Sequence, residues 1–215
     1  MQAVLWDMDG LLVDTEPLWT VAEVELAAAY GATWDEQIKA AVVGTRLDVA
    51  VPLVLRHFGM PVTPQHVDEI SQWLLRRMGE LFSTTLRPMP GAVELHDALR
   101  QQGVPQALVS SSYRVLVDGV LAAGYGPFDL TLAGDEVRQG KPHPEPYLTA
   151  AERLSADPAR CVVLEDSPSG VAAGTAAGCA VVAVPSVPGV EVGPASRRLV
   201  VPSLEQVSVA DLRGL

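Results

Sequence analysis

The stretch Val4-Leu5-Trp6-Asp7-Met8-Asp9-Gly10 decides how this chain folds. An apolar run that ends at an acid predicts a buried strand whose end meets water or a ligand. Because residues i and i+2 of a strand point the same way, Asp7 and Asp9 are expected to share one small space. Two carboxylates in one space repel each other, and a bound cation relieves that repulsion. An acidic turn after an edge strand fits this stretch equally well, so the rest of the chain decides between the two.

The composition describes an acidic chain with enough apolar residues for a sizeable core. The chain has 215 residues, of which 48% are hydrophobic, and a formal net charge of −11. This length fits one large domain, or one domain with a smaller insert. The negative charge argues against nonspecific binding to nucleic acid or to an anionic membrane. The net charge does not exclude a small phosphorylated molecule as a ligand, because cationic side chains near the site decide its binding.

Several features predict a cytoplasmic protein. No apolar run reaches the roughly 18 residues that a membrane helix needs, and no signal peptide is visible at the N-terminus. Cys161 and Cys179 lie in apolar, strand-like runs, which is typical of buried thiols rather than of a disulfide framework. No exposed apolar stripe is evident, so we expect a monomer.

The region after the first strand contains only helix patterns. Apolar residues recur at helical spacing from Pro17 to a stop at Gly31, and residues 33–36 predict a capping box that opens the next helix. Further helices are predicted from residue 48 to 58 and from Thr63-Pro64 to about residue 82. Residues 17–82 therefore form a predicted all-helical insert.

Strands and helices alternate after residue 90. The apolar runs predicted as strands are 105–110, 130–133, 161–164 and 180–184, with a possible short strand at 199–201. Strands that are apolar throughout and alternate with helices indicate a parallel sheet covered on both faces. The prediction is an α/β protein with a Rossmann-like three-layer core, formed by residues 1–16 and 83–215, and a helical cap formed by residues 17–82.

The predicted sheet brings polar residues to one edge. In an open parallel sheet, ligands bind beyond the carboxyl ends of the strands. The residues placed there by the predicted strands and the loop at 140–144 are Asp7, Asp9, Ser110, Ser111, Ser112, Lys141, Glu165 and Asp166.

These residue types suit phosphoryl transfer. Asp7, Asp166 and a backbone carbonyl could hold Mg²⁺, which prefers hard oxygen ligands. Lys141 could add a second positive charge, and Ser110 with the backbone amides after it could bind the other phosphate oxygens. Asp7 could then attack phosphorus, while Asp9 gives a proton to the leaving alcohol and later takes one from water.

The residues resemble the four motifs of the haloacid dehalogenase superfamily. The first motif is similar to Asp7-Met8-Asp9-Gly10, the second to Ser110 at the end of an apolar strand, the third to Lys141 in Gly-Lys-Pro-His-Pro, and the fourth to residues 164–167 with Gly170. The order matches, and the resemblance covers essentially the whole chain. The insert resembles the type I cap of this family, and residues 10–19 are similar to those of hexose and hexitol phosphate phosphatases in the β-phosphoglucomutase-like subgroup.

The resemblance implies a Mg²⁺-dependent phosphatase that works through an aspartyl-phosphate on a small phosphorylated metabolite. Asp7 would be the nucleophile and a metal ligand, and Asp9 the general acid and base and a ligand through its carbonyl. Ser110 and Lys141 would bind phosphate, with Ser111 beside them, and Asp166 would complete the metal site. Glu165 would contact the metal either directly or through a water molecule.

Two alternatives remain beside the phosphatase. Related sugar-phosphate mutases carry a His where this chain has Trp19, and they have more basic residues in the first cap loop, where this chain offers Arg46 alone. We therefore favour hydrolysis over mutase chemistry. A non-catalytic phospho-ligand binding protein would not need a nucleophile beside an acid/base.

Four cap residues carry open expectations. Arg46 is expected either to bind substrate oxygens or to be a solvated surface residue, and Trp19 either to face the cleft or to pack inside the cap. Lys39 is expected on a helix surface, and Trp34 in the cap core.

Overall fold

One parallel sheet forms the centre of the protein, in a computed structural model that describes residues 1–185 and 195–215. The strand order is β3-β2-β1-β4-β5-β6. The strands are β1 Ala3–Trp6, β2 Gln106–Val109, β3 Leu130–Leu132, β4 Cys161–Glu165, β5 Ala180–Ala183 and β6 Arg198–Val200. The predicted parallel α/β sheet is confirmed, and it places β1 between β2 and β4.

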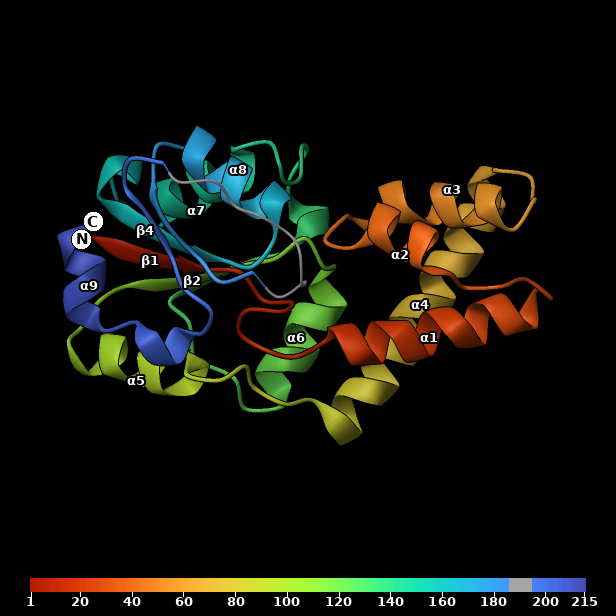
Figure 1. Cartoon of the computed structure of the whole chain (residues 1–215), viewed down its shortest axis with the longest axis horizontal. Helices are drawn as coiled ribbons and strands as arrows, with labels where there is room; N and C mark the ends of the chain where they lie inside the picture. The colour runs from red at the N-terminus through yellow and green to blue at the C-terminus, as the bar shows by residue number, and fades with distance from the viewer. Residues whose placement is uncertain (186–194) are drawn as a thin grey trace.

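Helices cover both faces of the sheet (Figure 1). Leu5 packs with Tyr147 and Val171 on one face, and Trp6 packs with residues from the other. The helices are α5 Ala92–Gln101, α6 Arg114–Ala122, α7 Glu145–Arg153, α8 Pro168–Ala176 and α9 Val209–Gly214. Short 3-10 turns lie at η1 Gly134–Glu136, η2 Pro158–Arg160 and η3 Leu204–Gln206. Because successive strand residues point to opposite faces, the short apolar strands bury side chains in both layers.

The first four of the five helices between β1 and β2 in the chain gather beside the sheet (Figure 1). They are α1 Glu16–Ala29, α2 Glu36–Val42, α3 Leu47–His57 and α4 Pro64–Thr85. We call residues 16–85 the cap. Helix α4 continues past the predicted end near residue 82, and the division of the chain into two domains stays a prediction.

The two segments that join the cap to the sheet run side by side. The amide of Asp14 donates to the carbonyl of Arg87 at 2.9 Å, and the amide of Met89 donates to the carbonyl of Leu12 at 3.0 Å. An antiparallel bridge also pairs Val13 with Pro88. Backbone pairing therefore ties the entry and the exit of the cap together directly behind the first motif.

Local differences from the sequence predictions have simple causes. The cap of α2 is Asp35, whose carboxylate accepts from the amides of Gln37 and Ile38 at 3.0 Å, so the predicted capping box at 33–36 is wrong. Helix α9 was not predicted, although Ser208 and Asp211 form a capping box at its start.

Part of the C-terminal tail, residues 186–194, lies outside the described residues. None of the described helices combines the length and apolar character needed to cross a membrane.

Candidate active site

Strand pairing brings the first and fourth motifs together. Strands β1 and β4 pair in parallel, with Trp6 opposite Leu164, so the residues that follow each strand meet at the same edge. The amide of Asp7 continues this pairing by donating to the carbonyl of Leu164 at 3.0 Å. The carboxylates of Asp7, Glu165 and Asp166 are buried and offer oxygens within 4.8 Å of one another.

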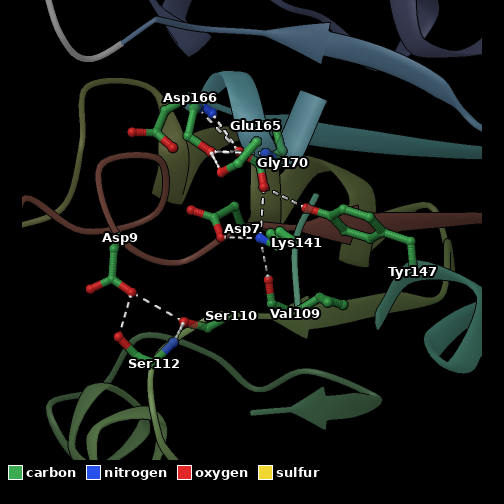
Figure 2. Close-up of polar contacts among 12 residues, drawn as sticks. Asp7, Asp9, Val109, Ser110, Ser112, Lys141, Tyr147, Glu165, Asp166 and Gly170 are labelled. Carbon is green, nitrogen blue, oxygen red and sulfur yellow. Dashed lines mark hydrogen bonds and ion pairs between the residues drawn. The ribbon is translucent and has the colours of Figure 1, made fainter. Parts of the chain in front are cut away.

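Lys141 reaches into this cluster from the loop before α7 (Figure 2). Its ammonium donates to the Asp7 carboxylate, to Glu165 Oε1 at 2.6 Å and to the carbonyl of Val109 at 3.0 Å. Only 2% of the Lys141 side chain is exposed. Burial alone would lower the pKa of Lys141, but the carboxylates of Asp7 and Glu165 outweigh burial and raise it. Lys141 therefore stays cationic at neutral pH.

Glu165 holds the surrounding loops rather than facing the cavity. Its Oε1 accepts from Lys141 and from the Tyr147 hydroxyl at 2.7 Å. Its Oε2 accepts from two backbone amides and from the Ser167 hydroxyl at 3.0 Å. A side chain at Gly170 would collide with it, because an added Cβ would lie 1.7 Å from Glu165 Oε1. These contacts use most of the acceptor capacity of this carboxylate, so it anchors Lys141 and the start of α8.

The cluster carries more negative than positive charge. Burial and the nearby Glu165 carboxylate raise the pKa of Asp7 well above its ordinary value, although Lys141 acts to lower it. Asp166 and Asp9 add further negative charge. A divalent cation with oxygen ligands suits this donor set, because it would neutralise the excess and accept carboxylates such as those of Asp7 and Asp166.

The carboxylate of Asp9 turns towards the second motif (Figure 2). Strand β1 ends at Trp6, so the expected i, i+2 alternation does not reach these residues. Asp9 accepts hydrogen bonds from the hydroxyls of Thr15 at 2.8 Å, Ser110 at 3.1 Å and Ser112 at 2.8 Å. Three hydroxyls therefore fix the carboxylate of Asp9, while Asp7 and Asp9 share one cavity, as expected.

A cavity of about 880 Å³, counting the open space at its mouth, lies between the cap and the sheet edge. Asp7, Asp9, Ser111, Lys141 and Asp166 line its floor, together with residues of the cap.

Ser110 and Arg46, which were expected to bind substrate, form hydrogen bonds with other groups of the protein. The Ser110 hydroxyl donates to Asp9, and the amide of Ser112 donates to the Ser110 hydroxyl at 2.9 Å. Arg46 forms a two-bond ion pair with Asp48 and donates to the carbonyl of Val137 at 3.1 Å. Arg46 therefore links the cap to the core beside the cavity, and the binding of substrate by Ser110 and Arg46 stays a prediction.

The sequence reasoning missed several residues of this site. Ser112 was visible in the hydroxyl run but was given no role, and Thr15 follows the first motif by a few residues. Tyr147 gave no signal, since a single aromatic residue in an amphipathic helix is usually a core residue.

Known proteins are similar to this chain along most of its length. The model of the haloacid dehalogenase-like hydrolase family matches residues 1–178. The bifunctional riboflavin kinase/FMN phosphatase of Arabidopsis thaliana is 36% identical over 191 residues, which are 86% of this chain and 48% of that protein. The chain thus spans about half the length of that relative. Hexitol phosphatase B of Escherichia coli K12 is 32% identical over 187 residues, 86% of this chain and 83% of that protein.

A solved structure has the same architecture. CbbY from Rhodobacter sphaeroides, in complex with xylulose 1,5-bisphosphate, superposes with a TM-score of 0.89 at 27% identity and covers 99% of each chain.

Replacing Lys141 should destabilise the fold more than removing the hydrogen bond from Tyr147 to Glu165. In Lys141→Met, several buried carboxylates lose their cation, and we expect the free energy of unfolding to fall by about 3–5 kcal/mol. In the control Tyr147→Phe, Glu165 loses one of several donors, and we expect a loss of about 1 kcal/mol. Equilibrium urea unfolding with a chelator present measures both. Equal losses for the two variants would contradict the role given to Lys141.

Proposed function

The chain belongs to the haloacid dehalogenase-like hydrolases, and on that premise we propose that it is a Mg²⁺-dependent phosphatase. Its substrate is a small phosphorylated metabolite, and its intermediate is an aspartyl-phosphate, the acyl phosphate of Asp7. The observation that carries the proposal is the buried contact of the Asp7 carboxylate with the Lys141 ammonium on the floor of a cavity. A binding protein gains nothing from holding a nucleophile in this way.

Two displacements at phosphorus complete the reaction. In the first, a bond forms between an Asp7 carboxylate oxygen and phosphorus while the bond from phosphorus to the leaving oxygen breaks, and Asp9 gives a proton to the leaving alcohol. In the second, Asp9 takes a proton from water, which attacks the same phosphorus. The bond to Asp7 then breaks and inorganic phosphate leaves.

The charged side chains around Asp7 assist these steps by orienting the reacting groups and offsetting their charge. Lys141 holds the Asp7 carboxylate in place and offsets part of the negative charge of the phosphate. Asp7 and Asp166 would hold the metal ion, with the carbonyl of Asp9 as a further ligand. When bound, Mg²⁺ supplies the positive charge that lets a carboxylate approach a phosphate dianion. The hydroxyls of Ser110 and Ser112 keep Asp9 oriented.

A sugar or polyol phosphate is the substrate class that we propose. Residues 10–19 favour it, and so does the similarity to hexitol phosphatase B. The similar structure of CbbY holds a sugar bisphosphate, which belongs to the same broad class of phosphorylated sugars. The proposal also includes a cytoplasmic monomer that acts on free metabolites, not on nucleic acid or membranes.

Asp7→Asn should abolish turnover. We expect the release of phosphate from p-nitrophenyl phosphate and from a panel of sugar and polyol phosphates to fall by about 10³-fold or more, because the nucleophile is lost. Asp68→Asn, an exposed change in the cap, is the matched control and should keep wild-type rates. Far-ultraviolet circular dichroism checks the fold of both variants. Phosphate release by Asp7→Asn at the wild-type rate would contradict the mechanism. Conversion of β-glucose 1-phosphate to glucose 6-phosphate without release would favour a mutase.

Mg²⁺ should stabilise the folded protein independently of turnover. A ligand at 100 times its Kd adds about 2.7 kcal/mol to the free energy of unfolding. We therefore expect Tm to rise with Mg²⁺ concentration in the wild type and in Asp68→Asn, and to stay constant in Asp166→Asn. Differential scanning fluorimetry measures this. A rise of Tm in Asp166→Asn equal to that of the wild type would contradict the proposed metal ligand.

A further inference from the structure

We propose that the cap selects phosphate monoesters whose leaving group is uncharged, and that Glu23 excludes substrates with a second phosphate. The inference rests on the proposed phosphatase function and narrows its substrate class. It assigns Glu23, a residue with no part in the two displacements, as a specificity-determining residue.

One face of α1 forms the wall of the cavity opposite the acid cluster. Glu16, Trp19, Glu23 and Leu26 all line the cavity. Their spacing of three, four and three residues places them along the same side of a helix. The cap therefore presents two acidic side chains to the part of the substrate that lies away from the reacting phosphate.

Positive charge that would bind a second phosphate is missing from this wall. Lys141 is the one cationic side chain among the described residues that line the cavity, and Asp7 and Glu165 already hold it. Arg46 is paired with Asp48 outside the lining. A second phosphate in this cavity would meet carboxylates without a cation of its own.

Lys39 compensates only part of the negative charge of the wall. Lys39 lies half-buried on the surface of α2, where its ammonium donates to the Thr20 hydroxyl on α1 at 3.2 Å. Its charge acts to lower the pKa of both Glu16 and Glu23. Burial and the Glu16 carboxylate nevertheless raise the pKa of Glu23 to about 8. Glu23 is therefore mostly protonated at neutral pH and becomes a carboxylate above this pKa, where a second phosphate would add two further negative charges to the wall.

The remaining lining suits an uncharged, hydroxylated molecule. Trp34 lines the cavity instead of lying only in the cap core, and its indole N–H is buried without a hydrogen-bond partner among the described residues. The hydroxyl protons of a leaving group would donate to the oxygens of Glu16 and Glu23. The other cap residues of the lining are mainly apolar: Leu26, Val42, Val43, Leu47, Ala50, Val51, Val54 and Leu74.

The test compares two ligands with one carbon skeleton. Fructose 6-phosphate and fructose 1,6-bisphosphate are titrated against the 215-residue chain at fixed ionic strength and at about pH 9, where Glu23 is charged. Binding is followed by quenching of tryptophan fluorescence, since Trp19 and Trp34 line the cavity, and phosphate release from both sugars and from p-nitrophenyl phosphate is measured in parallel. The proteins are the wild type, Glu23→Gln, Glu23→Lys and Glu69→Lys. Glu69 is exposed on α4, so Glu69→Lys repeats the charge change of Glu23→Lys away from the cavity.

The wild type should bind the bisphosphate roughly 100-fold more weakly than the monophosphate, because like charges placed opposite each other weaken binding strongly. Glu23→Gln should narrow this ratio, Glu23→Lys should bring it to about tenfold or less, and Glu69→Lys should leave it unchanged. Two results would overturn the inference: equal binding of the two sugars by the wild type, or an equal shift of the ratio in Glu23→Lys and Glu69→Lys. Selective binding with no phosphate release from any ester would refute the phosphatase proposal while the selectivity stands.

Discussion

The buried ion pair network of Lys141 is the interaction on which the structure of the site depends. One ammonium contacts the carboxylates of Asp7 and Glu165 and the carbonyl of Val109, and so joins the ends of β1, β4 and β2. Burying charge is costly unless every charge is paired and hydrogen-bonded. Here the pairing also leaves negative charge in excess, which a fold optimised for stability alone would avoid. The excess is what a site that binds a cation and a phosphate requires.

The topology explains why these groups meet. With β1 at the centre of a parallel sheet, its carboxyl end lies between those of β2 and β4, and each of these ends carries one motif. The cap enters the chain directly after the first motif and returns beside it through the pairing of residues 12–14 with 87–89. The nucleophile therefore lies at the junction of the cap and the core, where the cavity opens. Chemistry is assigned to the sheet edge and selectivity to the cap.

The sheet and the main acidic residues could be predicted because their signals are local. Apolar runs that end in acids, and an alternation of strands and helices, fix which residues reach the edge of the sheet. Other features depend on distances that no periodicity encodes. Tyr147 reaches Glu165 because α7 packs under β1, and Arg46 contacts Val137 because the cap lies against the core. Glu23 and Trp34 line the cavity for the same reason. The hydroxyl partners of Asp9 were missed because β1 ends one residue before Asp7, where strand alternation no longer gives the direction of a side chain.

The central claim is that Asp7 attacks phosphorus before water does. The stereochemical course of hydrolysis tests it most directly, with a substrate whose phosphate is made chiral by oxygen isotopes and with isotopically labelled water as the final acceptor. Two successive in-line displacements, first by Asp7 and then by water, predict retention of configuration at phosphorus in the released phosphate. Inversion would mean that water attacks the substrate directly, and it would contradict the aspartyl-phosphate mechanism.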